Sequence, residues 1–206
     1  MGNILKFSEE QLQLIQLGKE SNINYTLYLD KKYKPDQMEQ IYLGLIAGID
    51  ASIYASPTIR CVDMEKLRYA LIDEMQVGKY YRIGFSSWQL DLLLFQLKHK
   101  REVRYMDKIY IPSLARLIYM FYINDILIPK QVLNCNRLDV NIAPVLTVLG
   151  MYRRDITAYL DMQISIEEQH LFLEIIDKGY YIKDIMDIKD SAVRKEMCYK
   201  RLRLRK

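Results

Sequence analysis

The chain has 206 residues, of which 50% are hydrophobic and 27% are charged, a mix that excludes disorder over most of its length. Its formal net charge of +4 neither requires nor excludes a nucleic-acid partner. Three widely separated cysteines, Cys61, Cys135 and Cys198, do not suggest a disulfide framework, so we expect a reducing cytoplasm as the location. We expect neither a signal peptide nor a membrane-spanning segment.

Two stretches near the start of the chain match each other at an offset of 26 residues. The matches include glycines and polar positions as well as apolar ones: Gln11, Ile15, Gly18, Asn24 and Tyr28 correspond to Gln37, Ile41, Gly44, Asp50 and Tyr54. Self-similarity at such a period is typical of stacked repeats. The sequence therefore predicts an all-α, solenoid-like array of short helical hairpins. The alternative is an irregular all-α domain in which the two similar stretches have no wider meaning.

Each copy is predicted to hold a helix of about three turns followed by a shorter helical turn. In the first copy, Ser8 and Gln11 have the spacing of a capping box. In the second, Pro35 suits the first turn of a helix, Gly48 suits its C-terminal end, and Asp50 suits the cap of a short helix that follows.

Later copies are less regular. Apolar residues keep the spacing around residues 64–71, 90–97 and 114–121, residues 155–160 match residues 50–55, and an amphipathic helix ends near Gly179. About seven units fit the chain. We predict a repeat domain over residues 1–190 and a basic C-terminal helix or tail over residues 191–206.

Tyrosine is unusually frequent, with 17 residues against one Trp and five Phe. Tyr28, Tyr54 and Tyr159 occupy one position of the repeat, so those that are exposed would form a row that binds a partner. The alternative is that each packs within its own unit, with the hydroxyl at the rim.

Basic residues gather at the end of the chain. Arg201, Arg203, Arg205 and Lys206 are predicted to contact either phosphates or an acidic protein groove. The alternative is a solvated last helix whose cations complement its negative end. The pair Arg153-Arg154 precedes Asp155, a predicted cap, and is expected to line the same face.

Residues with catalytic chemistry do not form a recognisable pattern. The two histidines, His99 and His170, and the scattered cysteines do not have the spacing of a zinc site. A triad of Ser86, His99 and Asp107 has no support beyond its composition, and there is no glycine-rich phosphate loop. We therefore expect no enzyme activity, no metal and no cofactor.

The second copy resembles a short helical repeat of proteins from gut Firmicutes and their phages and mobile elements. The resemblance rests on Gln37-Met38, Ile41, Gly44-Leu45, Gly48-Ile49-Asp50, Tyr54-Ala55 and Pro57. It is specific over residues 34–59, weaker over residues 7–33 and only suggestive after Arg60. It implies a bacterial or phage-borne accessory protein, and it carries over no catalytic or binding residue.

These observations favour a non-enzymatic repeat protein that binds a macromolecule. Its most concrete form is a phage or mobile-element inhibitor of a bacterial defence nuclease, of the anti-CRISPR type. Such an inhibitor would either cover a basic or nucleic-acid-binding surface with acidic residues and tyrosines, or bridge protein and nucleic acid with its own basic tail. The alternatives are a nucleic-acid-binding regulator that uses the basic C-terminal helix, and a scaffold that forms homo-oligomers through apolar terminal repeats.

Overall fold

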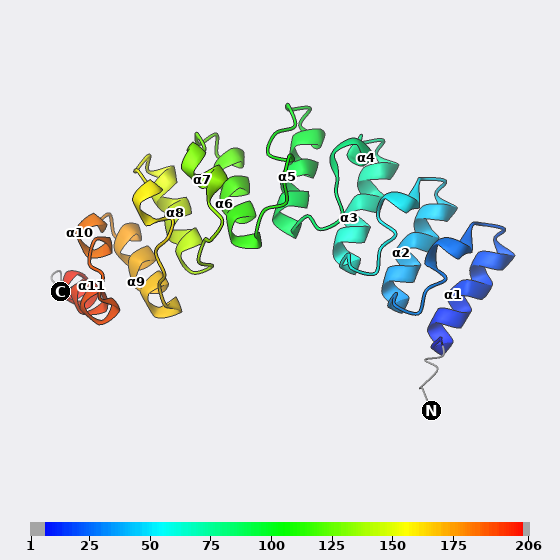
Figure 1. Ribbon diagram of the computed structural model, residues 1–206, viewed down its shortest axis with the longest axis horizontal. Coiled ribbons are helices and arrows are strands. Elements are labelled where there is room, and N and C mark those ends of the chain that lie inside the picture. Colours follow the sequence, from blue (N-terminus) through cyan, green and yellow to red (C-terminus); the bar gives the residue numbers. More distant parts are fainter. Residues whose placement is uncertain (1–6, 204–206) are drawn as a thin grey trace. The chain divides into compact units, whose positions relative to one another are not determined.

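The computed structural model describes residues 7–203, which are helical and contain no strand (Figure 1). The all-α class predicted from the sequence is confirmed for this part of the chain. Its α-helices are α1 (Glu9–Glu20), α2 (Pro35–Ile46), α3 (Cys61–Ile72), α4 (Val77–Tyr80), α5 (Ser87–Lys98), α6 (Pro112–Ile123), α7 (Lys130–Asn134), α8 (Ile142–Met151), α9 (Ile166–Asp177), α10 (Lys183–Met186) and α11 (Ser191–Arg203). Three 3-10 helices complete it: η1 (Tyr25–Tyr28), η2 (Ala51–Ile53) and η3 (Thr157–Tyr159).

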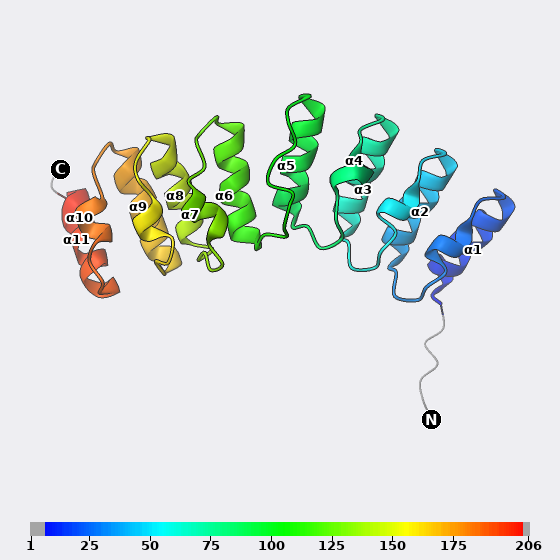
Figure 2. The same ribbon diagram turned by 45° about the horizontal axis from the view of Figure 1, so that its top comes forward.

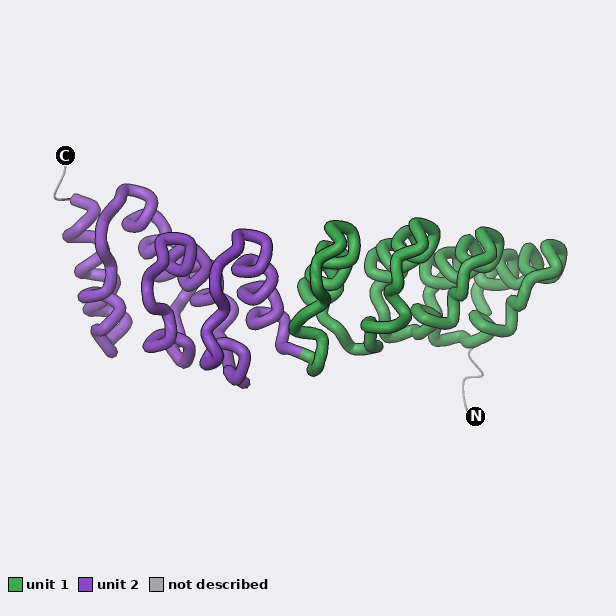
Figure 3. Tube along the Cα trace, turned by 90° about the horizontal axis from the view of Figure 1, so that it is seen from above, with its two compact units in different colours: residues 1–109 green, residues 110–206 purple. Residues whose placement is uncertain are grey.

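The chain divides into two compact units, residues 1–109 and residues 110–206 (Figure 3). Within the first unit, α1, α2, α3 and α5 follow one another side by side (Figures 1 and 2). Helix α11 begins at Ser191, where the basic segment was predicted to begin. It packs on α9 and α10 and belongs to the second unit, so it does not stand apart as a separate tail.

The long helices end in the same turn. After α2, Gly48 takes a φ of +73°, its N–H bonds to the Leu45 carbonyl at 3.1 Å, and the Ile49 N–H bonds to the Gly44 carbonyl at 3.1 Å. These two bonds define a Schellman motif, which satisfies carbonyls that the helix end leaves open. Within residues 7–203 the motif recurs around seven residues with positive φ: Asn22, Gly48, Glu74, Lys100, Asp125, Arg153 and Gly179.

The start of each early helix is tied to the segment that leads into the next one. The Gln11 side chain accepts a hydrogen bond from the N-cap N–H at 2.8 Å and donates to the Tyr33 carbonyl at 2.6 Å. Gln37 does the same, with 2.9 Å to its N-cap N–H and 2.5 Å to the Ile59 carbonyl. Tyr33 and Ile59 directly precede the N-cap residues of α2 and α3. One buried amide therefore caps its own helix and fixes the entry of the next.

The core of the first unit uses the same helix positions in successive copies. Met38, Met64 and Leu90 are spaced by 26 residues and are at most 1% exposed, and so are Ile41, Leu67 and Leu93. Burying a side chain of this size contributes roughly 1.5–3 kcal/mol relative to leaving it in water. These stripes explain why a helix of three turns, marginal in isolation, is stable here.

Glycine permits a close approach between each of the first two long helices, α1 and α2, and the turn that follows it. A Cβ added to Gly44 would lie 1.9 Å from the Tyr54 hydroxyl, and one added to Gly18 would lie 2.1 Å from the Tyr28 hydroxyl. Each hydroxyl donates to a helix carbonyl, Tyr54 to Gln40 at 3.1 Å and Tyr28 to Leu14 at 3.0 Å. Gly18 and Gly44, which match in the sequence, therefore leave the space that Tyr28 and Tyr54 fill.

The second unit keeps the turns but fills the space between helices differently. Gly150 of α8 is covered by the Phe121 ring of α6, whose nearest atom would lie 2.4 Å from an added Cβ. Between α9 and α11, Arg194 Nε donates to Glu168 Oε1 at 2.7 Å, and both side chains are at most 6% exposed. Arg194 also donates to the carbonyls of Ile188 and Lys189, so this buried charge is fully bonded.

Candidate functional sites

Two of the predicted partner-binding tyrosines lie in the core. Tyr28 and Tyr54 are 0% exposed, so the prediction that they form a binding row is wrong. The physical reason is that the glycine beneath each ring has no side chain, so the whole tyrosine packs against the helix and its hydroxyl donates to a backbone carbonyl. Burial raises the pKa of both phenols to about 12, so they stay neutral and bonded at physiological pH.

Tyr159 occupies a different setting from the other two. It is 7% exposed, and its hydroxyl donates to Asp187 Oδ1 at 3.0 Å instead of to a helix carbonyl. Burial, reinforced by the hydrogen bond to Asp187, raises the pKa of this phenol to about 12. Tyr159 lines a pocket of the second unit, so it is the one predicted tyrosine that lies at a candidate site.

The basic C-terminal helix is largely neutralised by neighbouring carboxylates. Within the described part of α11, four of its cations form ion pairs: Arg194 with Glu168, Lys195 with Glu167, Lys200 with Glu196, and Arg201 with Asp184. Arg203 is exposed, whereas Arg205 and Lys206 lie outside the described residues. Of the predicted contact residues, Arg201 therefore holds α10 against α11 through Asp184, at 2.6 Å.

A first candidate surface, here called the long-helix face, runs across α1, α2 and α3. It comprises residues spaced by three, seven and ten positions on each helix: Glu10, Gln13, Leu17 and Glu20; Asp36, Glu39, Leu43 and Ile46; Val62, Glu65, Tyr69 and Ile72. This spacing places the four residues of each helix on one side. All are exposed except Leu43, which is half-buried.

The long-helix face is acidic and apolar at once. It carries five carboxylates (Glu10, Glu20, Asp36, Glu39 and Glu65) and no lysine or arginine, although the whole chain has a net charge of +4. Its apolar side chains are large, with Tyr69 54% exposed and Ile46 51% exposed. The Arg68 guanidinium lies 4.3 Å from the centre of the Tyr69 ring and helps to hold it in place. Such a surface complements a partner that is basic and partly apolar.

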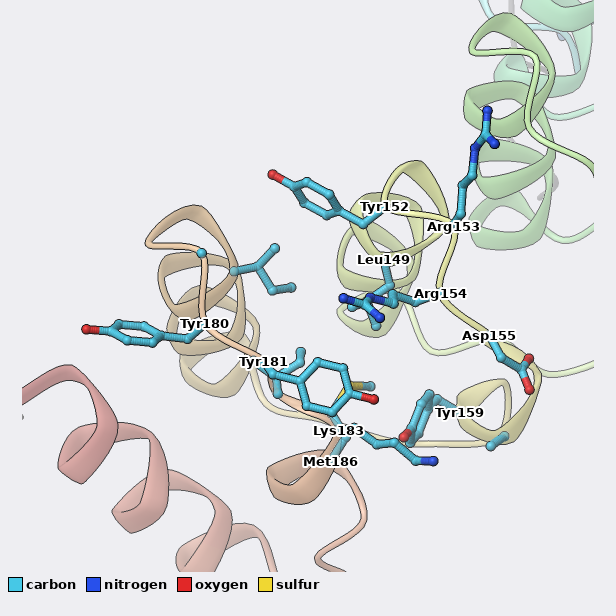
Figure 4. Close-up of a pocket in the computed structure, with 14 residues that line it drawn as sticks. Leu149, Tyr152, Arg153, Arg154, Asp155, Tyr159, Tyr180, Tyr181, Lys183 and Met186 are labelled. Atoms are coloured by element: carbon cyan, nitrogen blue, oxygen red, sulfur yellow. The ribbon is translucent and has the colours of Figure 1, made fainter.

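A second candidate site is a pocket of about 410 Å³ in the second unit (Figure 4). It lies between the turn after α8, the helical turn η3 and the segment that joins α9 to α10. Its floor is apolar, with Leu149, Ile176, Ile182 and Met186. Around it stand Tyr152, Arg153, Arg154, Asp155, Tyr159, Tyr180, Tyr181 and Lys183. In Figure 4, the Tyr181 ring lies between Arg154 and Lys183, and Tyr159 lies beside Lys183, whereas Arg153 points away from them.

The carboxylates around this pocket are already engaged. Asp155 accepts from the Thr157 N–H at 2.9 Å and from its hydroxyl at 2.7 Å, and these bonds lower the pKa of the Asp155 carboxyl. Asp184 pairs with Arg201, and the hydrogen bonds from Arg201 lower the pKa of the Asp184 carboxyl. Asp187 accepts a hydrogen bond from the Tyr159 hydroxyl. Asp184 is therefore neutralised by an ion pair, whereas Asp155 and Asp187 accept from neutral donors and keep their negative charge.

The cations of the pocket are available by contrast. Among residues 7–203, neither Arg154 nor Lys183 forms an ion pair, and both are exposed. The Arg154 guanidinium lies 5.2 Å from the centre of the Tyr181 ring, a cation–π contact that keeps it over the hollow. The pocket therefore carries more positive than negative charge, since Arg154 and Lys183 stand against the single carboxylate of Asp155, and it has aromatic and apolar walls, a combination that suits an organic anion.

The sequence interpretation missed this pocket. It noted Arg153-Arg154 but not the Tyr180-Tyr181 pair, which follows the next long helix. Arg154 and Tyr180 stand 26 residues apart, directly after positive-φ residues of equivalent turns, so they begin neighbouring segments. Comparing the residues after each predicted C-cap would have brought the two pairs together.

The metal-ligand residue types and the buried cysteine of the described chain do not add a further candidate site. Residues 7–203 contain no group of three His, Cys, Asp or Glu side chains that could hold a metal ion. Cys198 is buried, and burial raises the pKa of its thiol to about 11, which disfavours the reactive thiolate. Within the same range, no helix is both long and apolar enough to cross a bilayer.

Comparison of the chain with known protein families, with curated proteins and with solved structures finds no match. The candidate sites therefore stand on their own geometry.

Proposed function

We propose that the chain is a non-enzymatic helical-repeat protein, a solenoid-like array, that binds a basic protein through its long-helix face. The array is supported by recurring local structure at nearly constant spacing. The positive-φ residues of its turns follow one another at intervals of 25 to 28 residues, from Asn22 to Gly179. Equivalent core positions and the buried amides of Gln11 and Gln37 join consecutive helices of the first unit.

The observation that carries the protein partner is the composition of the long-helix face. Five carboxylates and no lysine or arginine among the residues that define this face produce a local negative field in a chain that is positive overall, with the buried Arg68 as the cation behind Tyr69. Exposed Ile46, Tyr69 and Ile72 provide apolar area at the same place. Acidic charge steers a basic partner, and the apolar side chains then supply contact area.

The most specific form of the proposal is an inhibitor of a bacterial defence nuclease. RNA-guided nucleases hold their nucleic acid in positively charged channels, which an acidic, partly apolar face can cover. The phage and mobile-element context comes from the resemblance of residues 34–59 alone. A nuclease partner therefore rests on charge complementarity together with that resemblance.

The two alternatives have weaker support. Nucleic-acid binding by α11 has to compete with its ion pairs, which leave Arg203 as the exposed cation without an ion pair in the described part of that helix. Self-association through α1 has the side chains of Leu12 and Leu17, which are 52% and 43% exposed, as its apolar surface. Its other outward positions are polar, since the α1 residues that correspond to the half-buried Tyr42 and Leu45 of α2 are the exposed Gln16 and Lys19.

The partner proposal is tested with the full chain as bait in a bacterial lysate at low salt, beside a double variant, Glu39→Lys with Glu65→Lys. Both residues are exposed, so we expect the variant to keep the fold, and it cancels most of the negative charge of the face because two lysines then oppose the remaining Glu10, Glu20 and Asp36. The matched control is Asp161→Lys with Asp177→Lys, which makes the same change of charge on exposed residues of the second unit.

We expect proteins that the wild type and the control retain to be lost by the face variant. The recovered partner, or a purified RNA-guided nuclease, is then assayed for cleavage of its target DNA with and without the protein. Retention that does not depend on the long-helix face contradicts the proposed surface. A face-dependent partner whose nuclease activity is unaffected contradicts only the inhibitor form.

A further inference from the structure

The pocket of the second unit has features that the proposed protein partner does not use. It lies in residues 149–186, whereas the long-helix face lies in residues 10–72. Its cations Arg154 and Lys183 form no ion pair within residues 7–203, and the acidic side chain in the lining, Asp155, accepts hydrogen bonds from Thr157 while the nearby Lys183 charge helps to lower the pKa of its carboxyl. An anion entering this hollow meets positive charge without having to displace an internal ion pair.

The walls of the pocket indicate which anion fits. A bare inorganic ion would use the charges but not the apolar floor of Leu149, Ile176 and Ile182, nor the ring of Tyr181, which is 54% exposed. The volume of about 410 Å³ is in the range of pockets that bind small organic ligands. The expected ligand therefore joins an anionic group to a flat ring.

We propose that this pocket binds a nucleoside phosphate. The phosphate lies between the Arg154 guanidinium and the Lys183 ammonium, and the base packs against Tyr181 and the apolar floor. Arginine donates two parallel hydrogen bonds to phosphate oxygens, and lysine adds a point charge. Stacking of a base on an aromatic side chain contributes binding energy whichever base is present, because every base has a flat face.

The nucleotide can be free or can belong to a single strand. A second hollow, lined by Phe121, Ile126, Leu127 and Met151, adjoins the first and shares Arg153, Arg154 and Asp155 with it. It gives the next nucleotide of a strand an apolar surface beside the same cations. Both sources present the same phosphate and base to Arg154 and Tyr181, so the probes have to separate them.

The test uses the full chain and four probes: AMP, adenosine, inorganic phosphate, and a fluorescein-labelled oligothymidylate. Binding of the first three is measured by calorimetry and of the strand by fluorescence anisotropy. We expect AMP or the strand to bind, and adenosine and phosphate alone to bind at least tenfold more weakly. Binding by AMP assigns the pocket to a free nucleotide, whereas binding by the strand alone assigns it to single-stranded nucleic acid.

Variants locate the site. We expect Arg154→Gln with Lys183→Gln to weaken the bound probe by roughly tenfold or more, and Tyr181→Ala to weaken it more than Tyr181→Phe does. The matched control, Lys200→Gln with Arg203→Gln, removes two exposed cations of α11 in the same unit and should leave affinity within roughly twofold. Unchanged circular dichroism shows that each variant is folded, as expected for exposed side chains.

Three results overturn the proposal. They are no binding of AMP or of the strand at low salt, equal affinity for AMP and adenosine, and equal loss of affinity in the pocket and control variants. Polyglutamate that displaces the bound probe at lower concentration than AMP does would also overturn it, because the pocket would then be a site for acidic peptides. None of these outcomes bears on the long-helix face, which is tested separately.

Discussion

The contact between Gly44 and Tyr54 allows a quantitative test of how the copies are held together. Replacing Gly44 with alanine adds a methyl group 1.9 Å from the Tyr54 hydroxyl and 3.2 Å from the carbon that bears it. Tyr54 is completely buried, so its ring cannot rotate into solvent. Replacing Tyr54 with phenylalanine removes the atom in conflict and leaves the ring carbon as the nearest neighbour.

The expected free-energy changes follow from these distances. Alanine is favoured over glycine in a helix by about 1 kcal/mol, but overpacking and the displaced hydroxyl outweigh this gain, so we expect Gly44→Ala to destabilise by about 2 kcal/mol. Tyr54→Phe loses one buried hydrogen bond, about 1 kcal/mol. The double variant keeps only a mild 3.2 Å contact and should lose about 1 kcal/mol, so the two changes couple by about 2 kcal/mol.

The assay is denaturant unfolding of the four proteins of this cycle, followed by circular dichroism. Gly18 and Tyr28 form the matched cycle, but a methyl group on Gly18 would also lie 2.7 Å from the Tyr25 Cβ, which cannot move without the backbone. Tyr28→Phe should therefore rescue Gly18→Ala only in part. Gly48→Ala, which strains a φ of +73° but meets no atom within 4 Å, should not couple to Tyr54. Additive effects of Gly44→Ala and Tyr54→Phe would refute the reasoning.

Three further predictions concern buried polar groups. Although burial opposes it, hydrogen bonds from Ser165 and Arg194 hold the pKa of Glu168 below its usual 4.5, so its contribution to stability is present above pH 4.5 and lost as pH falls below it. Glu168→Gln should cost about 3–5 kcal/mol at neutral pH and flatten the acid side of a stability–pH curve, whereas equal acid slopes would contradict this role. The phenol of Tyr54, with its pKa raised to about 12, should make stability fall as pH rises from 10 through 12, and Tyr54→Phe should reduce that slope in alkaline unfolding experiments. Gln37→Glu should lower the unfolding midpoint more than Gln37→Met, because a carboxylate placed against the Ile59 carbonyl replaces a donor with an acceptor; an equal loss would mean that the bond contributes little.

The sequence predicted local structure well because the signals for helix ends are chemical and short-range. Ser8 with Gln11 forms the capping box that their spacing indicated, and α2 begins at Pro35. Gly48 takes the left-handed conformation expected of a residue just past a helix end, and Asp50 accepts from the Ser52 N–H at 3.1 Å. In each case the deciding partner lies within four residues, so the pattern contains the whole interaction.

The predicted binding residues were less successful because exposure is decided by neighbours distant in sequence. The sequence shows that Tyr28 and Tyr54 share a repeat position, but only the structure shows that they are buried against Gly18 and Gly44. The basic helix has an excess of cations by composition, yet Arg194 and Arg201 find carboxylates 26 and 17 residues away.

The sequence by itself determined the helical class, the caps and the 26-residue correspondence of the first two copies, because hydrogen bonds between near neighbours fix them. Tertiary structure decided which polar side chains remain free. Arg154 and Lys183 form no ion pair within residues 7–203, whereas Arg201 is paired with Asp184 across α10 and α11. A charge acts most strongly on a ligand when the fold gives it no ion-pair partner, and that pairing depends on residues distant in sequence, which no local pattern records.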